Sequence, residues 1–214
     1  MERTLTKKGQ ATRQRIIEGA AHQIRLSGAE FTLDDVCAAT HTSKSQLFHY
    51  FPEGRKQLLL EVVRYETDQE LAAHVPYLTN LSTWPGWPAW RDALVERYQN
   101  HLHNDPMCAA IAALPGDGLA VQAILHGASG QLHQLITAAI EGTQSTGDIG
   151  PQINPAHAAT ALITAIQGGA AEMMCTDSTD HLATTIDFIL DALRLSGTIG
   201  APAATRQKSA RSTV

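Results

Sequence analysis

The chain has 214 residues, 43% of them hydrophobic, and a formal net charge of −5, which allows one small and one larger domain or a single large helical body. No uncharged apolar run approaches the ~20 residues needed to cross a bilayer, and the polar N-terminus lacks the apolar segment of a secretory signal. Cys37, Cys108 and Cys175 are odd in number and widely spaced, which argues against a disulfide framework. Composition thus excludes a membrane-spanning or disulfide-stapled protein and predicts a cytoplasmic one.

Positive charge is concentrated near the N-terminus. Residues 1–65 hold ten Lys and Arg against seven Asp and Glu, a net +3, and the remainder carries −8. An acidic protein with a basic end would hold DNA at that end and repel it elsewhere. The number alone does not exclude an ordinary fluctuation of surface charge, so both interpretations stay open.

The first predicted element is an amphipathic helix over residues 10–27. Its apolar residues recur at helical spacing and form one stripe, which consists of Ile16, Ile17, Ala20, Ala21 and Ile24. Gly28 is a suitable end for this helix, and the opposite face carries several arginines. We expect the stripe to face a core and the arginines to face solvent or a negatively charged partner.

Residues 31–51, FTLDDVCAATHTSKSQLFHYF, contain two short helices joined by a tight turn. Thr32 and Asp35 have capping-box spacing at the start of the first helix, and Ser43 and Gln46 have it at the start of the second. Only two residues separate the helices. A helix-turn-helix motif that enters the DNA major groove requires this arrangement. The alternative is a structural corner between two helices of a bundle.

A further helix begins at Arg55-Lys56, after Pro52 and Gly54 interrupt the chain. Positive side chains at a helix N-terminus oppose the helix dipole, so local stability does not favour them there. A phosphate held between these cations and the free backbone N–H groups would supply the missing anion. The pattern therefore favours a phosphate contact at this point.

The rest of the chain is predicted to be helical, with no strand pattern. A polar, Gly- and Pro-containing loop is expected over residues 143–155, and residues 201–214 form a basic tail that we expect to be disordered. The predicted helices cover residues 87–103, 108–114, 119–142, 155–175 and 179–195.

Several of these features together resemble one known family. Phe31-Thr32-Leu33, Val36, Ser43-Lys44 and the stretches LFHYFP (47–52) and RKQL (55–58) are similar to the N-terminal domain of the TetR family of transcriptional regulators. The resemblance covers about residues 11–63, and residue types and both turn lengths agree at once.

Two positions depart from the family pattern. Phe48 stands where many relatives carry a tyrosine whose hydroxyl reaches a DNA phosphate, so that contact should be missing. Arg55 replaces a usual lysine and keeps its charge. The spelling FPEGR and the stretch from Asp105 to Pro115 resemble the LmrA/YxaF-like subgroup.

The resemblance implies an all-α protein with about nine helices. Residues 1–55 would form a three-helix helix-turn-helix domain, residues 56–200 a larger ligand-binding and dimerisation domain, and residues 201–214 the basic tail. The function implied is a ligand-responsive repressor that binds a palindromic operator as a dimer. An activating role is left open.

The helical pattern nominates the residues that contact DNA. Leu47 and Phe51 point inward, so the opposite face of the second short helix faces the groove. Gln46 can pair with adenine, Lys44 can donate to guanine or phosphate, and the turn hydroxyls and first cations of the next helix would hold phosphates. The predicted DNA-binding residues are Thr42, Ser43, Lys44, Ser45, Gln46, His49, Tyr50, Arg55 and Lys56.

The two C-terminal helices offer more apolar surface than one intramolecular contact uses, and Gly168-Gly169-Ala170-Ala171 permits a close helix approach. The family implies that this pair, at about 155–175 and 179–195, forms the homodimer interface, and that the middle helices enclose an effector pocket. Since residues 66–202 contain only three cations, we expect a hydrophobic or aromatic effector. For each candidate lining residue a place in the core is the stronger interpretation; the candidates are Trp87, Trp90, Tyr98, Met107, Ile111, Leu114, Leu125, His133 and Gln167.

Other chemistries find little support in the sequence. His126 and His133 are two turns apart, roughly 10 Å by helical rise, so they do not form a chelating pair. Ser129 has Gly130 directly after it and no preceding strand, unlike the nucleophile of a hydrolase elbow. We therefore expect no metal, cofactor or catalytic residue. The remaining alternatives are an all-α enzyme and a DNA-binding protein without an effector.

Overall fold

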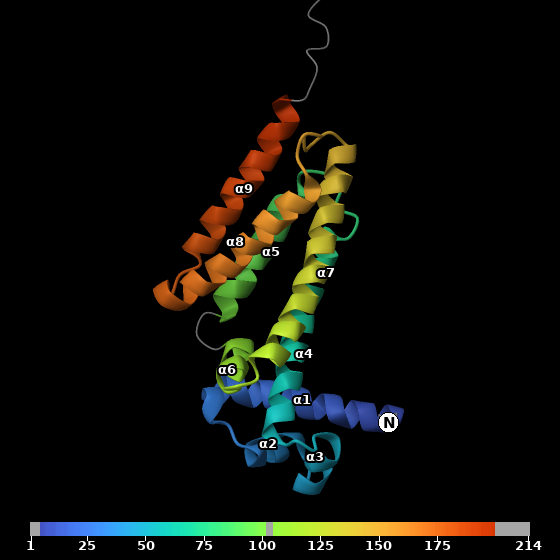
Figure 1. Cartoon of the computed structure of the whole chain (residues 1–214), viewed down its shortest axis with the longest axis vertical. Helices are drawn as coiled ribbons and strands as arrows, with labels where there is room; N and C mark the ends of the chain where they lie inside the picture. The colour runs from blue at the N-terminus through green and yellow to red at the C-terminus, as the bar shows by residue number, and fades with distance from the viewer. Residues whose placement is uncertain (1–4, 102–104, 200–214) are drawn as a thin grey trace, which may run out of the picture. The chain divides into compact units, whose positions relative to one another are not determined.

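A computed structural model describes residues 5–101 and 105–199. Over these residues the chain forms nine α-helices, one 3-10 helix and no strand, so the predicted all-α class is confirmed (Figure 1). The predicted tail, 201–214, lies outside the described residues. In chain order the elements are α1 (Lys7–Ser27), η1 (Gly28–Glu30), α2 (Leu33–Thr40), α3 (Lys44–Tyr50), α4 (Arg55–Leu78), α5 (Gly86–His101), α6 (Pro106–Ala112), α7 (Gly118–Ser145), α8 (Pro155–Thr176) and α9 (Asp180–Ile199).

Capping side chains decide where several helices begin. The Thr6 hydroxyl accepts a hydrogen bond from a first-turn backbone N–H at 3.2 Å, so α1 begins three residues before its predicted start. Asp105 accepts one from the Met107 N–H at 2.8 Å, and Pro106 occupies the first position of α6, which also begins early. Gly28, at φ 60°, ends α1 as predicted.

The polar segment after Gly142 begins as helix rather than as the predicted loop, since α7 continues to Ser145. The reason is the burial of Thr143. Its hydroxyl accepts a hydrogen bond from the Trp87 indole N–H at 3.0 Å and donates one to the Ala139 carbonyl at 2.8 Å. The contact with Trp87, which is distant in the sequence, therefore keeps Thr143 in α7, although the local composition predicts that the helix ends before it.

The described residues pack into two compact units. Unit 1 comprises residues 5–76 and 97–132, and unit 2 comprises residues 77–96 and 133–199, with 102–104 outside the description. Helices α4, α5 and α7 each contribute residues to both units. The boundary expected after residue 55, between a helix-turn-helix domain and a ligand-binding and dimerisation domain, stays a prediction.

Unit 1 has one hydrophobic core that the helix-turn-helix shares with α6 and α7. Ile24, Val36 and Leu47, from α1, α2 and α3, are at most 1% exposed. Ala110 of α6 and Val121 of α7 belong to the same cluster, and Figure 1 shows α6 beside α1. The first three helices therefore do not bury their apolar faces by themselves. A displacement of α6 or α7 would alter the packing of the core that they share with α1, α2 and α3.

Unit 2 contains α8 and α9, which lie side by side (Figure 1). They approach closely at Gly169, where an added Cβ would lie 2.6 Å from the Leu182 Cα. The prediction that small residues on α8 permit a close helix approach is thus confirmed at Gly169, for a neighbour within the same chain. The Arg91 guanidinium of α5 also holds the Asp187 carboxylate of α9 through two hydrogen bonds.

None of the described helices combines the length and the hydropathy that a membrane crossing requires.

Candidate nucleic-acid interface and ligand cavities

Both short helices of the helix-turn-helix begin with a complete capping box, as predicted. The Thr32 hydroxyl accepts from the Asp35 N–H at 3.2 Å, and Asp35 Oδ2 accepts from the Thr32 N–H at 2.8 Å. The hydrogen bonds from Thr32 lower the pKa of Asp35. Ser43 and Gln46 make the equivalent pair of bonds, both at 3.2 Å. These contacts fix the start of α2 and of α3, and hence the direction in which α3 leaves the turn.

The turn between α2 and α3 excludes one predicted DNA contact. His41 adopts a left-handed conformation at φ 49°. Thr42 is only 5% exposed, and its hydroxyl donates to the Thr40 carbonyl at 3.2 Å. The Thr42 side chain therefore stabilises the turn and is not available to a phosphate, which corrects the prediction. Helical spacing gave no information about a residue in a turn.

Helix α3 buries one face and exposes the other. Leu47 and Phe51 are at most 1% exposed, as predicted. Tyr50 is half-buried, with its ring edge-on to His49 at a centroid distance of 5.0 Å. The exposed side chains are Ser43, Lys44, Ser45, Gln46, Phe48 and His49. Phe48, 48% exposed, was missing from the predicted surface, although its position one turn after Lys44 places it on the same face.

Each lysine of this surface has a carboxylate partner within unit 1. Lys44 Nζ lies 2.8 Å from Asp34 Oδ1, and Lys56 Nζ lies 2.6 Å from Asp117 Oδ1. These carboxylates raise the pKa of both lysines. The Arg55 guanidinium lies over the Phe31 ring, 4.7 Å from its centroid. The expectation that the cations opening α4 lack any anion is therefore wrong for Lys56, whose partner comes from a distant part of the sequence.

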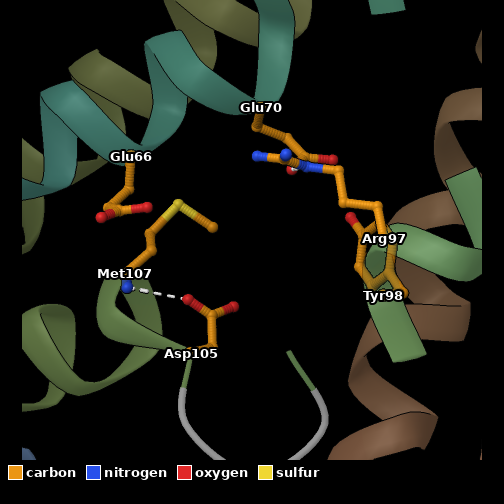
Figure 2. A pocket seen from close by; sticks show the side chains of 6 residues that line it. All are labelled: Glu66, Glu70, Arg97, Tyr98, Asp105 and Met107. Carbon is orange, nitrogen blue, oxygen red and sulfur yellow. Dashed lines mark hydrogen bonds and ion pairs between the residues drawn. The ribbon is translucent and has the colours of Figure 1, made fainter. Parts of the chain in front are cut away.

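A small polar cavity lies between α4, the end of α5 and α6, all within unit 1. Its volume is ≈ 40 Å³, room for a few water molecules at most. Figure 2 shows the six side chains around it: Glu66, Glu70, Arg97, Tyr98, Asp105 and Met107.

Ion pairs account for much of the charge around this cavity. Arg97 Nε donates to Glu70 Oε2 at 2.5 Å, and Arg25 pairs with Glu66 at 2.7 Å. Burial acts to raise the pKa of Glu70, but its interactions with His74 and Arg97 outweigh it and leave that pKa below the usual value. Burial, and then the charge of Glu70, raise the pKa of Tyr98. The charged side chains around this cavity are therefore held by ion pairs.

A larger hollow lies between α4 and the first half of α7, also within unit 1. Its volume of ≈ 450 Å³ is within the range of small-molecule sites, ~300–1,000 Å³. Most of its surface comes from small or aliphatic residues, with a few polar groups at the side of α4. It is lined by Leu60, Arg64, Thr67, Asp68, Ala120, Ala123, Ile124, Gly127, Ala128 and Gln131.

The predicted pocket residues do not converge on one site. Tyr98 and Met107 line the small polar cavity. The others occupy cores, a hydrogen bond or the surface: Trp87, Trp90 and Leu114 are buried, Ile111 and Leu125 pack against the unit 1 core, His133 Nε2 lies 3.0 Å from the Ala156 carbonyl, and Gln167 is exposed. None of the nine lines the larger hollow. Aromatic residues at helical spacing mark cores as readily as pockets, and a lining of alanine and glycine gives no sequence signal.

No protein-family model matches the chain. An uncharacterised HTH-type transcriptional regulator of Mycobacterium tuberculosis, found in strains H37Rv and CDC 1551, is 35% identical over 94 residues. The match covers 44% of this chain and 45% of the relative, so it spans less than half of the relative's length.

Solved structures are similar over most of the chain. A TetR transcriptional regulator from Chloroflexus aurantiacus has a TM-score of 0.66 at 19% identity and covers 87% of this chain and 96% of that one. A TetR regulator from Haloarcula marismortui has a TM-score of 0.63 at 16% identity, over 86% and 98%. A TetR regulator from Streptomyces coelicolor has a TM-score of 0.58 at 20% identity, over 85% and 98%. The chain thus has the fold of TetR-type transcriptional regulators.

Proposed function

We propose that the protein is a ligand-responsive transcriptional repressor of the TetR type, which binds a palindromic operator as a homodimer and releases it when a small molecule binds. The observation that carries this proposal is the exposed face of α3. A short helix with a capping box at its start presents Lys44, Ser45 and His49 to solvent. The cations that open α4 follow a few residues later in the chain. This is the geometry that a major-groove helix and its flanking phosphate contacts require. The narrower similarity to the LmrA/YxaF-like subgroup stays a prediction.

The proposed DNA contacts divide into two groups. Ser45, His49 and Lys44 are proposed to contact base edges, with the Gln46 amide nitrogen as a further donor. Ser43, Tyr50, Arg55 and Lys56 are proposed to set the register on phosphates. Lys44 and Lys56 must leave their carboxylate partners to do so. The Lys44–Asp34 pair is exposed on both sides, so its exchange meets little resistance, whereas Asp117 is partly buried beside Lys56.

The proposed homodimer forms through α8 and α9. These helices pack together at Gly169, yet three large apolar side chains on them remain exposed: Met174 at 70%, Phe188 at 76% and Leu195 at 60%. Exposed apolar surface of this kind is typical of an interface. A two-fold dimer presents two copies of α3 about one DNA turn apart and therefore requires a palindromic site.

The effector is proposed to be a hydrophobic or aromatic small molecule that binds the hollow between α4 and α7. The hollow has the volume and the largely apolar lining for such a ligand. The first turns of α7 also share the core of the helix-turn-helix through Val121. A ligand that shifts α7 against α4 would thus act on the packing of the helix that carries Lys56. This location replaces the aromatic pocket expected from the sequence.

The test is the selection of binding sites from random duplex DNA, followed by measurement of affinity against salt concentration. Lys56→Ala should weaken all sequences alike and reduce the salt slope by ~1 per subunit, since each phosphate contact contributes about that much. Arg64→Ala removes the same charge from an exposed position further along α4 and serves as the control, with little change expected. If no palindromic sequence is enriched, the proposed function is wrong.

The proposed effector site has a separate test. Ala128→Trp would fill the hollow from α7. It should weaken the binding of an anilinonaphthalene sulfonate dye, whose aromatic rings bind apolar surfaces. Gly130→Trp, two residues away and outside the lining, is the control. Equal dye binding by both variants would exclude the hollow as the ligand site.

A further inference from the structure

Helix α3 exposes the apolar ring of Phe48 beside two polar side chains, Gln46 and Lys44, that already have partners within the protein. Gln46 Oε1 accepts the Ser43 N–H at 3.2 Å as part of the capping box. Gln46 needs both its oxygen and its nitrogen to pair with adenine. Such a pair would therefore break the hydrogen bond from the Ser43 N–H that caps the start of α3. Lys44 is paired with Asp34 at 2.8 Å. Phe48 lies one turn beyond Lys44 on the same exposed face.

The Phe48 ring packs in part against Gly54. An added Cβ on Gly54 would lie 3.2 Å from the ring Cε1, so the ring rests against the backbone of the turn that leads into α4. Gly54 has φ 66°, a conformation that favours glycine, and the absence of a side chain there makes room for the ring. The ring is 48% exposed, whereas Leu47 before it is 1% exposed. An exposed aromatic ring thus lies on α3 one turn after Lys44 and a few residues before the cations that open α4.

We propose that Phe48 determines sequence specificity by contacting the C5-methyl group of one thymine in each operator half-site. Thymine displays a methyl group in the major groove, and phenylalanine is among the side chains that contact it. The surrounding charges favour this partner, because the proposed phosphate contacts Arg55 and Lys56 follow Phe48 in the chain and Lys44 lies one turn before it. The inference rests on the proposed DNA-binding function.

The test uses the full-length protein and the site that it selects from random duplex DNA. Each thymine of that site is replaced in turn by deoxyuridine, which removes the methyl group and keeps the hydrogen-bonding edges. At one thymine per half-site, affinity should fall about fourfold, the fold-change that corresponds to ~0.8 kcal/mol for one buried carbon group. The effect should be about 15-fold when both half-sites are changed, since the two contacts are equivalent.

Phe48→Ala should bind the thymine and deoxyuridine sites equally, and Phe48→Gln gives the same measurement if the alanine variant does not fold. His49→Ala, an exposed neighbour on α3, should bind more weakly but keep the preference for thymine. If the wild type ignores every deoxyuridine, or if Phe48→Ala and Phe48→Gln keep the preference, this inference is wrong although DNA binding stands. If no site is selected, the proposed function and this inference both fail.

Discussion

Gly169→Ala tests the packing of α8 against α9. The added Cβ would lie 2.6 Å from Cα and 2.8 Å from Cβ and Cδ1 of Leu182, which is fully buried. Carbon atoms in contact are ~3.5–4.0 Å apart, so the two helices would have to separate by roughly 1 Å. Overpacking of this kind costs ~1–3 kcal/mol, whereas alanine in place of glycine inside a helix gains ~0.8–1 kcal/mol. The free energy of unfolding should therefore fall by ~0–2 kcal/mol.

Gly130→Ala is the matched control. Gly130 is an exposed residue of α7, and nothing lies within 4 Å of its added Cβ, so only the helix-propensity gain applies. The two variants should differ by the overpacking cost, which amounts to about 2–12 °C in Tm for a chain of this length. The assay is thermal unfolding followed by circular dichroism at several protein concentrations, because the stability of a dimer depends on concentration. Equal Tm values for Gly169→Ala and Gly130→Ala would refute the reasoning.

Two further predictions concern buried and surface polar contacts. Thr143→Val leaves the buried indole N–H of Trp87 without its acceptor and should lower the free energy of unfolding by ~1–3 kcal/mol in urea denaturation. Thr143→Ser keeps the hydroxyl and is the control. Equal losses of stability in both variants would contradict the role of the hydrogen bond. Asp117→Asn frees Lys56 and should raise DNA affinity at low salt and steepen its salt dependence. Asp68→Asn makes the same charge change elsewhere in unit 1, and an equal rise in affinity there would attribute the effect to net charge alone.

The sequence alone determined the features that depend on neighbours a few residues apart. Both capping boxes, the apolar stripe of α1 and the end of α1 at Gly28 follow from spacing, because a capping side chain reaches only its own first turn and a helix repeats every 3.6 residues. Those features were enough to predict a helix-turn-helix, and the helical pattern of the rest of the chain, without a strand pattern, predicted the all-α class. Helix ends were less certain: nothing local showed that Thr143 would find a buried partner and extend α7.

Only the tertiary structure decided which side chains remain available for binding. Lys56 and Asp117 are distant in the sequence and meet because α6 and α7 share the core of the helix-turn-helix. Trp87 and Trp90 became core, whereas the hollow between α4 and α7 is lined by small residues with no pattern of their own. Periodicity indicates that a residue faces inward but cannot say whether another helix fills the space there. Whether the space is filled depends on contacts between distant segments. The exposure of the Phe48 ring and its contact with Gly54 likewise follow from the folded structure.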